Sequence, residues 1–550
     1  MMSDAARIDV DRYGQDHLYT FWDELNTEEQ SELLDDISRI NFSAVSRITD
    51  APPDCSSGLD DKLLPPDPKV CGSLAELRTS QPLLLERYFN TALKAVSENK
   101  VAVLLLAGGQ GTRLGVPYPK GLYKPNLPSG RSLYQLQAER LLRVSQICKE
   151  TFGKTPSITW YIMTSEHTKE TTVQYFKSFD YFGHNRDNIV FFEQYTLPVF
   201  SVDGKILLQT KSKLTSAPDG NGGLYRALKE RGILDDMKSR GIEYVQIYCV
   251  DNILVKIPDL HFIGYCIENN ADCAAEVVQR LDPEEPIGVV GVVDGRYQIV
   301  EYSEISRAKA YLRVNQYNSH NNNNDNNNNN VDSKDLSYFN DTNRLVYSHG
   351  NICVHFMTKS FLDYVCQDEI QMKMRYHRAQ KKVTCIDLNT GELIVPQKPN
   401  AIKFEKFAFD VFPFAKQFFI WEVPRDEQFS PLKNGLNAIK DCPQTARLDL
   451  LTYHTRLAKN AGALFTINNN NNNNNGNNNH NVTSNGNGHL HNNNNSSVHD
   501  DTMALIEISP LITYNGENLS FLKGVEIHGL HCLEQDKETG KPVLIPCKKE

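Results

Sequence analysis

The 550-residue sequence lacks several patterns that would assign it to a class of protein at once. Its 12 cysteines include no C-x-x-C pair, so we expect reduced thiols rather than a zinc site or a disulfide framework. No apolar run approaches the length of a membrane span. The N-terminal segment is acidic and has no apolar core, so we expect no signal peptide and a cytoplasmic location.

The sequence also lacks an excess of positive charge. It carries 58 Lys and Arg against 68 Asp and Glu, which gives a formal net charge of −10 and a pI of about 5.9. This balance argues against a general nucleic-acid-binding protein, so any bound anion must be held by a local cluster of cations. A hydrophobic content of 40% and a charged content of 23% are typical of globular proteins. The length predicts two or three domains.

Two asparagine-rich tracts, at about residues 318–333 and 468–496, interrupt segments that have strand patterns. Such tracts cannot bury apolar surface, and long loop insertions cost little stability, so we expect disordered surface loops. A neutral insertion and a role in self-association both remain open. The rest of the chain divides into a helical N-terminal region (1–98), a middle domain (99–435) and a small C-terminal α+β domain (436–550).

The middle region alternates between strand and helix patterns. Residues 101–107 form a short all-apolar run, as a central parallel strand requires, and residues 157–165, 188–194 and 244–252 are further strand candidates. An amphipathic helix is predicted at 131–150, with Ser132 and Gln135 as a capping box. The alternation predicts an α/β fold with a doubly wound, Rossmann-like sheet, in which ligands bind beyond the carboxyl ends of the strands.

A glycine-rich loop, "AGGQGTRLG", follows the first of these strands. Its glycines would let backbone N–H groups approach a phosphate, and Arg113 and Lys120 follow closely. The loop is neither G-x-G-x-x-G, because Leu114 occupies the last glycine position, nor a Walker A motif. The loop alone predicts phosphate binding through another arrangement, although a structural turn would also account for it.

The segments "LAGGQGTRLG" and "YPKG" resemble the signature of UDP-sugar pyrophosphorylases, and the sequence is most similar to the eukaryotic UDP-N-acetylhexosamine type. The resemblance extends over about residues 90–440 and includes "APDGNGGLYRAL", "YCVDNILVKIPD", "GNICVHF", "KPNAIKFEKFAFDVF" and "EVPRDEQFSPLKN", in the expected order. It implies a nucleotidyltransferase fold. It also implies reversible transfer of a uridylyl group from UTP to N-acetylglucosamine 1-phosphate, with Mg²⁺ required and Mn²⁺ as an alternative.

The reaction that the resemblance implies needs no general base, because the attacking sugar-phosphate oxygen is already ionised at neutral pH. Two polyanions must meet, so catalysis should rest on positioning and on cations. Arg113 and Lys120 are therefore the expected catalytic residues.

The same resemblance, position by position, assigns the contacts of the two substrates. The residues matching nucleotide contacts are Leu106, Ala107, Gly108, Gly109, Lys120, Gln194, Gly220, Asp251 and Lys403, and those matching sugar contacts are Asn221, Glu301, Tyr302, Asn351 and Lys433. Asp251 and Asp410 are the metal candidates, since Mg²⁺ prefers one or two carboxylates plus phosphate oxygens. A buried structural role would fit Asp410 equally well.

Several alternatives remain open at this point. The enzyme could prefer UDP-glucose or accept many UDP-sugars, and a pocket with room for an acetyl group could also accept N-acetylgalactosamine 1-phosphate. A non-catalytic sensor of UTP or a UDP-sugar is the alternative from another class. We expect no nucleic-acid or membrane partner, and the chain could be a monomer or a homodimer.

Overall fold

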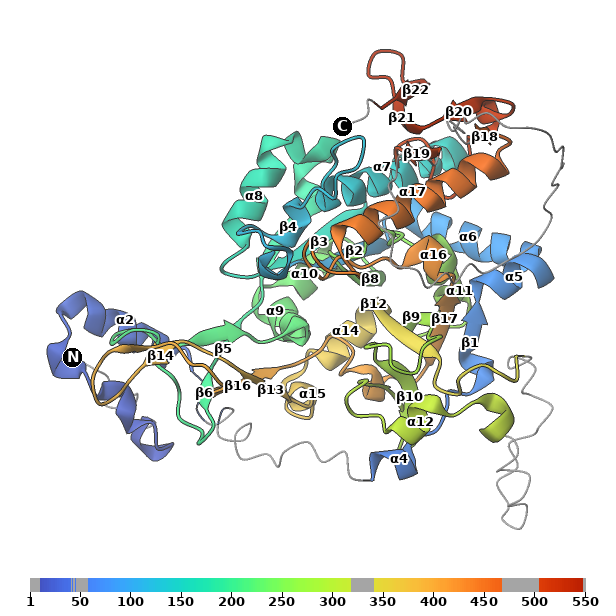
Figure 1. The fold of residues 1–550 in the computed structure, drawn as a ribbon. Helices are drawn as coiled ribbons and strands as arrows, with labels where there is room; N and C mark the ends of the chain where they lie inside the picture. Colours follow the sequence, from blue (N-terminus) through green and yellow to red (C-terminus); the bar gives the residue numbers. More distant parts are fainter. Residues whose placement is uncertain are drawn as a thin grey trace, which may run out of the picture.

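The computed structural model describes residues 10–40, Phe42, Val45, 58–317, 341–466 and 504–547 (Figure 1). Both asparagine-rich tracts lie outside the described residues, so the expectation of disordered loops there stays a prediction.

A 10-stranded sheet forms the centre of the structure. Along its main path all neighbouring strands are parallel except β12, which is antiparallel to both neighbours, and a hairpin of β10 (Val289–Val293) and β11 (Arg296–Val300) extends from β12. The path runs through β1 (Cys71–Ser73), β17 (Phe418–Val423), β9 (Cys273–Gln279), β12 (His349–Thr358), β8 (Tyr244–Cys249), β2 (Val101–Leu106), β3 (Thr159–Thr164) and β4 (Ile189–Glu193).

Helices cover both faces of this sheet, which confirms the predicted doubly wound α/β fold. All six residues of β2 are buried, and alternate side chains face different cores: Val103 packs with one hydrophobic cluster and Leu104 with the other. The first cluster contains side chains of α6 (Pro82–Ser97), α7 (Leu133–Phe152), α8 (Lys169–Ser178) and α11 (Leu260–Glu268). The second contains side chains of α9 (Leu224–Glu230), α10 (Ile233–Ser239) and α14 (Lys359–Val365).

The helix starts follow the sequence signals closely. Asn26 caps α2 (Thr27–Ser38) and forms a reciprocal capping box with Glu29. Ser132 caps α7 through a 3.2 Å hydrogen bond from the backbone N–H of Gln135, as predicted. The Gln135 side chain, however, donates to Glu139 at 2.9 Å instead of returning to the cap. The predicted capping box at α7 is therefore half formed, because the Gln135 side chain is directed toward Glu139 and does not accept the backbone N–H of Ser132.

The helical N-terminal region divides between two places instead of forming one layer. Helix α6 packs against α11 on the main sheet, and α5 (Leu74–Ser80) follows the edge strand β1. The earlier segment packs far away, against a small sheet of β13 (His377–Lys381), β16 (Ala401–Glu405) and β6 (Phe200–Ser201), as Figure 1 shows. Leu33 of α2 shares one core with Phe200 and Phe404.

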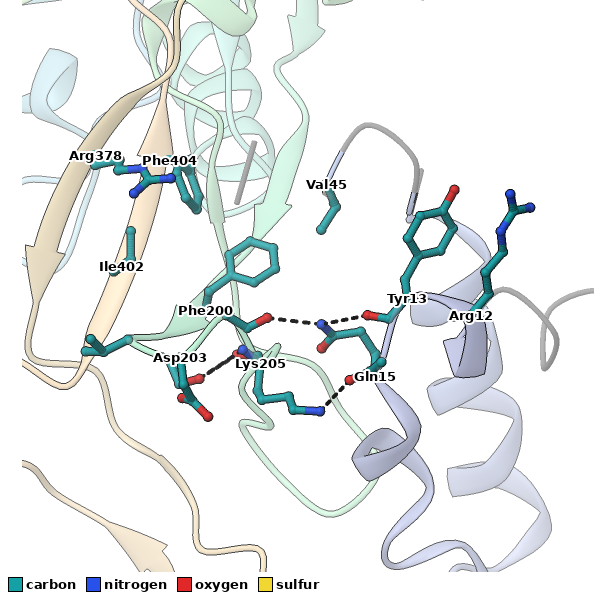
Figure 2. Close-up of a pocket in the computed structure, with 14 residues that line it drawn as sticks. Arg12, Tyr13, Gln15, Val45, Phe200, Asp203, Lys205, Arg378, Ile402 and Phe404 are labelled. Carbon is teal, nitrogen blue, oxygen red and sulfur yellow. Dashed lines mark hydrogen bonds between the residues drawn. The ribbon is translucent and has the colours of Figure 1, made fainter. Parts of the chain in front are cut away.

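Figure 2 shows the contact between this segment and β6, where Gln15 donates a 3.0 Å hydrogen bond to the carbonyl of Gly204. A cavity of about 510 Å³ opens here beside Phe200 and Phe404. None of the residues assigned to substrates lines it, so this cavity is separate from the candidate site.

The C-terminal region combines one long helix with short strands. It contains α17 (Pro443–Asn460), a three-stranded sheet of β19 (Leu505–Ile508), β21 (Leu530–Gln535) and β22 (Pro542–Pro546), and the pair β18 (Leu464–Thr466) and β20 (Glu526–His528). Buried Arg131, just before α7, donates to Glu534 at 2.6 Å, to Ser509 at 3.0 Å and to Glu139 at 2.7 Å. This network joins the C-terminal region to the main sheet's helices.

Short elements complete the described fold. They are α4 (Leu59–Lys62), β5 (Thr196–Pro198), β7 (Ser216–Pro218), α12 (Arg307–Tyr311), α15 (Asp368–Gln371), β14 (Cys385–Ile386), β15 (Leu393–Ile394) and α16 (Arg425–Gln428).

Candidate active site

The parallel strands β2, β3, β4 and β8 all end at the same edge of the sheet. The residues that follow them are therefore brought together: the glycine loop after Leu106, Ser165 after β3, Gln194 after β4 and Asp251 after β8. Three of these four positions carry residues that the sequence assigned to the nucleotide, and they arrive at this edge from well-separated parts of the chain.

The glycines of the loop have different neighbours. The Gly108 carbonyl accepts a 2.9 Å hydrogen bond from Ser165, and a Cβ on Gly108 would lie 2.7 Å from Oε1 of Gln194. A Cβ on Gly111 would lie 2.4 Å from Cγ2 of Val116. Gly109 is exposed, and nothing lies within 4 Å of its Cβ position. Gly108 and Gly111 are thus required by packing, whereas the bare backbone of Gly109 faces open space.

This difference gives a test of the loop. Gly109→Ala should leave thermal stability unchanged but weaken UTP binding about tenfold, because a methyl group would occupy space that the phosphates need. Gly111→Ala is the matched control and should lower the free energy of unfolding by about 1–3 kcal/mol through overcrowding. Calorimetry of UTP binding and thermal denaturation measure the two effects. Normal UTP affinity in Gly109→Ala would contradict a phosphate-binding role for this backbone.

The candidate cations lie at the same edge. Nζ of Lys120 lies 3.4 Å from Oδ2 of Asp251, and the two side chains are 15% and 20% exposed. Arg113 lies on an exposed single turn, Thr112–Leu114, with no side-chain hydrogen bond within the described ranges. Both predicted catalytic cations are therefore in reach of solvent and of a ligand.

The segment carrying Lys433 connects Asp251 to the glycine loop. The backbone N–H of Leu432 donates a 2.8 Å hydrogen bond to the carbonyl of Asp251. The Cβ position of Gly435 lies 3.2 Å from the carbonyl oxygen of Arg113. Lys433, half-buried between these two contacts, is thus brought to the neighbourhood of Lys120 and Asp251.

A second glycine segment, residues 219–223, is held by the end of β16. Gly220 has a left-handed φ of +84°, and a Cβ there would lie 2.3 Å from the carbonyl oxygen of Lys406. Gly222 donates a 2.8 Å hydrogen bond to that same carbonyl, and the side chain of Asn221 accepts one of 2.9 Å from the backbone N–H of Ala408. Half-buried Lys403 lies on β16 itself. The backbone of the segment that follows β16, at Lys406 and Ala408, therefore fixes the orientation of Asn221.

Two of the residues assigned to the sugar, Asn351 and Glu301, meet at Gly288. The backbone N–H of Asn351 donates a 2.8 Å hydrogen bond to the Gly288 carbonyl, and the Gly288 Cβ position lies 3.0 Å from Oε1 of Glu301. Glu301 and the 53%-exposed Tyr302 line a cavity of about 560 Å³ together with His377. Burial raises the pKa of Glu301, and the nearby Glu304 raises it further.

Asp410 has a partner that the sequence did not indicate. Its carboxylate accepts a 2.9 Å hydrogen bond from Nε2 of His377 and a 2.7 Å hydrogen bond from the backbone N–H of Phe407. A metal ion bound to Asp410 would have to compete with these two donors. No motif surrounds His377 in the sequence, so sequence reasoning had no signal for this pair.

Asp219 is a second residue that the sequence analysis did not single out. It is 5% exposed, and its Oδ1 has no hydrogen-bond partner in the described part of the chain. Burial raises the pKa of Asp219 to about 7. Lys406, also buried, lies behind the same segment, and burial lowers the pKa of its ammonium group to about 8.

A raised carboxyl pKa has a definite consequence for stability. The folded state favours protonated Asp219. The contribution of this protonation to the free energy of unfolding is complete below the unfolded pKa of about 4 and is lost as the pH rises to about 7. Relative to wild type, Asp219→Asn should gain about 2–4 kcal/mol of unfolding free energy between pH 4 and pH 8. Denaturant titrations across this range measure it, with the exposed Asp235→Asn as control. Parallel pH profiles for wild type and Asp219→Asn would contradict this account.

Comparison with known proteins identifies the family of this chain. Residues 73–476 match the model of the family described as UTP–glucose-1-phosphate uridylyltransferase. The chain belongs to this uridylyltransferase family. It is 42% identical over 550 residues to a UDP-N-acetylhexosamine pyrophosphorylase-like protein from Xenopus tropicalis, with 98% of each chain covered. It is 39% identical to UDP-N-acetylglucosamine diphosphorylase 2 of Arabidopsis thaliana, with 82% of this chain and 84% of that protein covered.

A solved structure supports the same assignment of the uridylyltransferase fold. The crystal structure described as a putative UDP-N-acetylglucosamine pyrophosphorylase from Entamoeba histolytica superimposes with a TM-score of 0.65 at 30% identity. The match covers 85% of this chain and 98% of that chain. In the described part of this uridylyltransferase, no helix is both long and apolar enough to cross a membrane.

Proposed function

We propose that this uridylyltransferase joins UTP and N-acetylglucosamine 1-phosphate to give UDP-N-acetylglucosamine and pyrophosphate. The names of its full-length relatives support the N-acetylated sugar. The single structural observation that carries the proposal is the Lys120–Asp251 pair, 3.4 Å apart, beside the open backbone of Gly109. A cation, a carboxylate and free amides at one strand edge are what a polyphosphate and its counter-ion require.

In this proposal the protein acts by positioning and by charge. The backbone of residues 106–109 and the side chain of Gln194 bind the nucleoside, and the loop amides reach the phosphates. Gln194 lies so near Gly108 that a Cβ there would be 2.7 Å from its Oε1. Lys120 and Arg113 balance the negative charge that two phosphate esters bring together, and Lys433 holds the sugar phosphate. Because the attacking oxygen is ionised at neutral pH, no protein group has to remove a proton.

Asp251 fits the requirement for a magnesium ligand. It follows a buried central strand, it is 20% exposed, and only its Oδ2 has a side-chain partner among the described residues. Among the described residues, no three or more His, Cys, Asp or Glu side chains are grouped so that they could hold a metal ion by themselves. That arrangement suits Mg²⁺, or Mn²⁺ in its place, which takes one or two carboxylates and completes its shell with phosphate oxygens and water. When bound, the ion would neutralise phosphate charge.

The sugar is held, in this proposal, between Glu301, Asn221 and Asn351. The Glu301 carboxylate can accept hydrogen bonds from vicinal hydroxyl groups, and Tyr302 lies at the cavity rim. Asn351 and Glu301 both approach Gly288, and Asn351 is the expected neighbour of the N-acetyl group. N-acetylgalactosamine 1-phosphate carries the same N-acetyl group and differs only in the orientation of its 4-hydroxyl, so we propose that a site with room for this group accepts it as a second substrate.

A substrate panel tests this proposal. Pyrophosphate release from UTP and Mg²⁺ should be at least about tenfold faster, as kcat/KM, with N-acetylglucosamine 1-phosphate than with glucose 1-phosphate. Asn351→Ala should lower kcat/KM with N-acetylglucosamine 1-phosphate more than kcat/KM with glucose 1-phosphate. The ratio between the two sugars should therefore fall. Equal activity with both sugars would favour the broad-specificity alternative, which the family description keeps open. UTP binding without turnover of any sugar phosphate would favour a sensor.

We propose a cytoplasmic location as well, because free cysteines are stable in a reducing compartment and the described chain contains no disulfide. Fractionation of cells followed by immunodetection of the protein tests the location.

A further inference from the structure

Two cysteine side chains meet next to the candidate active site. Sγ of Cys249, the last residue of β8, lies 3.1 Å from Sγ of Cys353 in β12. Both residues are free thiols and both are half-buried. Neither residue belongs to the sets assigned to the nucleotide, the sugar or the metal, so the pair has no place in the proposed reaction.

The position of the two thiols suits a covalent bond between them. Strands β8 and β12 are antiparallel, and their ladder ends where Ile247 pairs with His355. Cys249 and Cys353 each lie two residues beyond this pair, where β12 is irregular. Their sulfur atoms lie 3.1 Å apart, about 1 Å more than the bond length of about 2.05 Å in a disulfide.

The pair is connected to three residues of the candidate site. Cys249 precedes Asp251 by two residues, and the backbone N–H of Cys353 donates a 3.1 Å hydrogen bond to Oδ1 of Asn351. Nδ2 of Asn221 lies 3.9 Å from Sγ of Cys353. Cys353 itself has a left-handed φ of +57° and lies in the irregular part of β12, between Asn351 and Val354. A covalent bond between the two sulfurs would therefore shift residues of both β8 and β12.

The chemistry of the pair differs from that of the other cysteines. The Cys249 thiol is oriented as a hydrogen-bond donor to Sγ of Cys353, an arrangement that stabilises Cys353 as the thiolate. Burial raises the pKa of the fully buried Cys148, Cys266 and Cys273. The thiolate is the reactive form in disulfide exchange, so Cys353 is the expected attacking group of the pair.

We propose that Cys249 and Cys353 form a reversible dithiol–disulfide site that is oxidised by a low-molecular-weight disulfide such as oxidised glutathione. The Cys353 thiolate attacks one sulfur of that disulfide, which forms a mixed disulfide and releases one small thiolate. Cys249 then loses its proton and attacks Sγ of Cys353, which releases the second small thiol. The protein loses two electrons and two hydrogens, and the small disulfide is reduced to two thiols.

The bond should slow the proposed reaction, and this consequence rests on the proposed function. Closing the 3.1 Å separation to the bond length of about 2.05 Å moves the two sulfurs together by about 1 Å. The loop to Asp251 and the hydrogen bond to Asn351 must adjust to that movement. Misplacement of about 1 Å can cost about 10²-fold in rate, so we expect kcat/KM to fall at least about tenfold in the oxidised protein.

The experiment equilibrates the full-length protein with glutathione buffers of increasing oxidised fraction and maps disulfides by peptide mass spectrometry. We expect a Cys249–Cys353 cross-link in wild type, a loss of activity in proportion to it, and recovery of both with dithiothreitol. Cys249→Ser and Cys353→Ser, each compared with its own reduced sample, should resist the loss, whereas Cys547→Ser, a half-buried control, should behave as wild type.

Two results would overturn the proposal. One is mapping that finds Cys249 and Cys353 unlinked where glutathione is fully oxidised. The other is a complete cross-link that leaves kcat/KM unchanged. Because the mapping does not depend on activity, a protein with no turnover would refute the proposed function without deciding the fate of the thiol pair.

Discussion

Lys120→Ala should lower kcat by about 10²–10³-fold, the usual effect of losing one preorganised charge donor. The Lys120 ammonium group lies 3.4 Å from Asp251 and close to the open glycine backbone, where the triphosphate is expected. Because the substitution cannot change the overall equilibrium, synthesis and pyrophosphorolysis should fall by the same factor in kcat/KM. Steady-state assays in both directions measure the effect.

The control for this prediction is Lys124→Ala, an exposed lysine four residues further along the chain. It should retain activity, and both variants should have the thermal stability of wild type. The role assigned to Lys120 would be wrong if Lys120→Ala raised only the KM for UTP and left kcat intact. That result would indicate a lysine that binds the ground state and the transition state equally.

The second large effect concerns stability. Arg131→Met should lower the free energy of unfolding by about 3–5 kcal/mol, the cost of leaving buried carboxylates without their cation. Arg131 is 6% exposed and donates to Glu139 and Glu534, while Glu507 lies 3.8 Å from it. Burial already raises the pKa of Glu139 and Glu507. Denaturant unfolding at neutral pH measures the loss.

Lys62→Met is the matched control, because Lys62 and Asp294 form an exposed ion pair at 3.0 Å. Its removal should cost at most about 1 kcal/mol. Since three of the Arg131 partners belong to the C-terminal region, Arg131→Met should also make that region more sensitive to proteolysis. An Arg131→Met protein as stable and as protease-resistant as wild type would show that the Arg131 network contributes nothing to stability.

The sequence predicted the parts of the structure that repeat a simple pattern. The all-apolar run at 101–107 became the buried central strand β2, and the glycines after it reached the carboxyl edge, as the alternation of strands and helices required. Ser132 was recognised as a helix cap because a cap depends on a few neighbouring residues. The roles of Arg113 and Lys120 came from the family resemblance together with the charge that the implied reaction requires, and they stay predictions.

Features that depend on distant contacts were not visible in the sequence. The antiparallel direction of β12 within an otherwise parallel path depends on how the chain returns to the sheet, and no local pattern encodes it. The partner of Asp410, His377, comes from a strand 33 positions away in the sequence. Asp219 looked like an ordinary turn residue, although burial makes it one of the most perturbed carboxyl groups near the site.

Strand β1 covers the outer edge of β17 and so decides where a shortened form of the protein can begin. Residues 71–73 pair in parallel with Ile420, Trp421 and Glu422, and the Cβ position of Gly72 lies 2.8 Å from the Trp421 ring. A recombinant fragment beginning at residue 99 would leave the sequence "FFIWEV" as an uncovered outer strand. Free backbone groups on so apolar an edge recruit other chains, so such a fragment would accumulate as aggregates, whereas one that keeps β1 would stay dispersed.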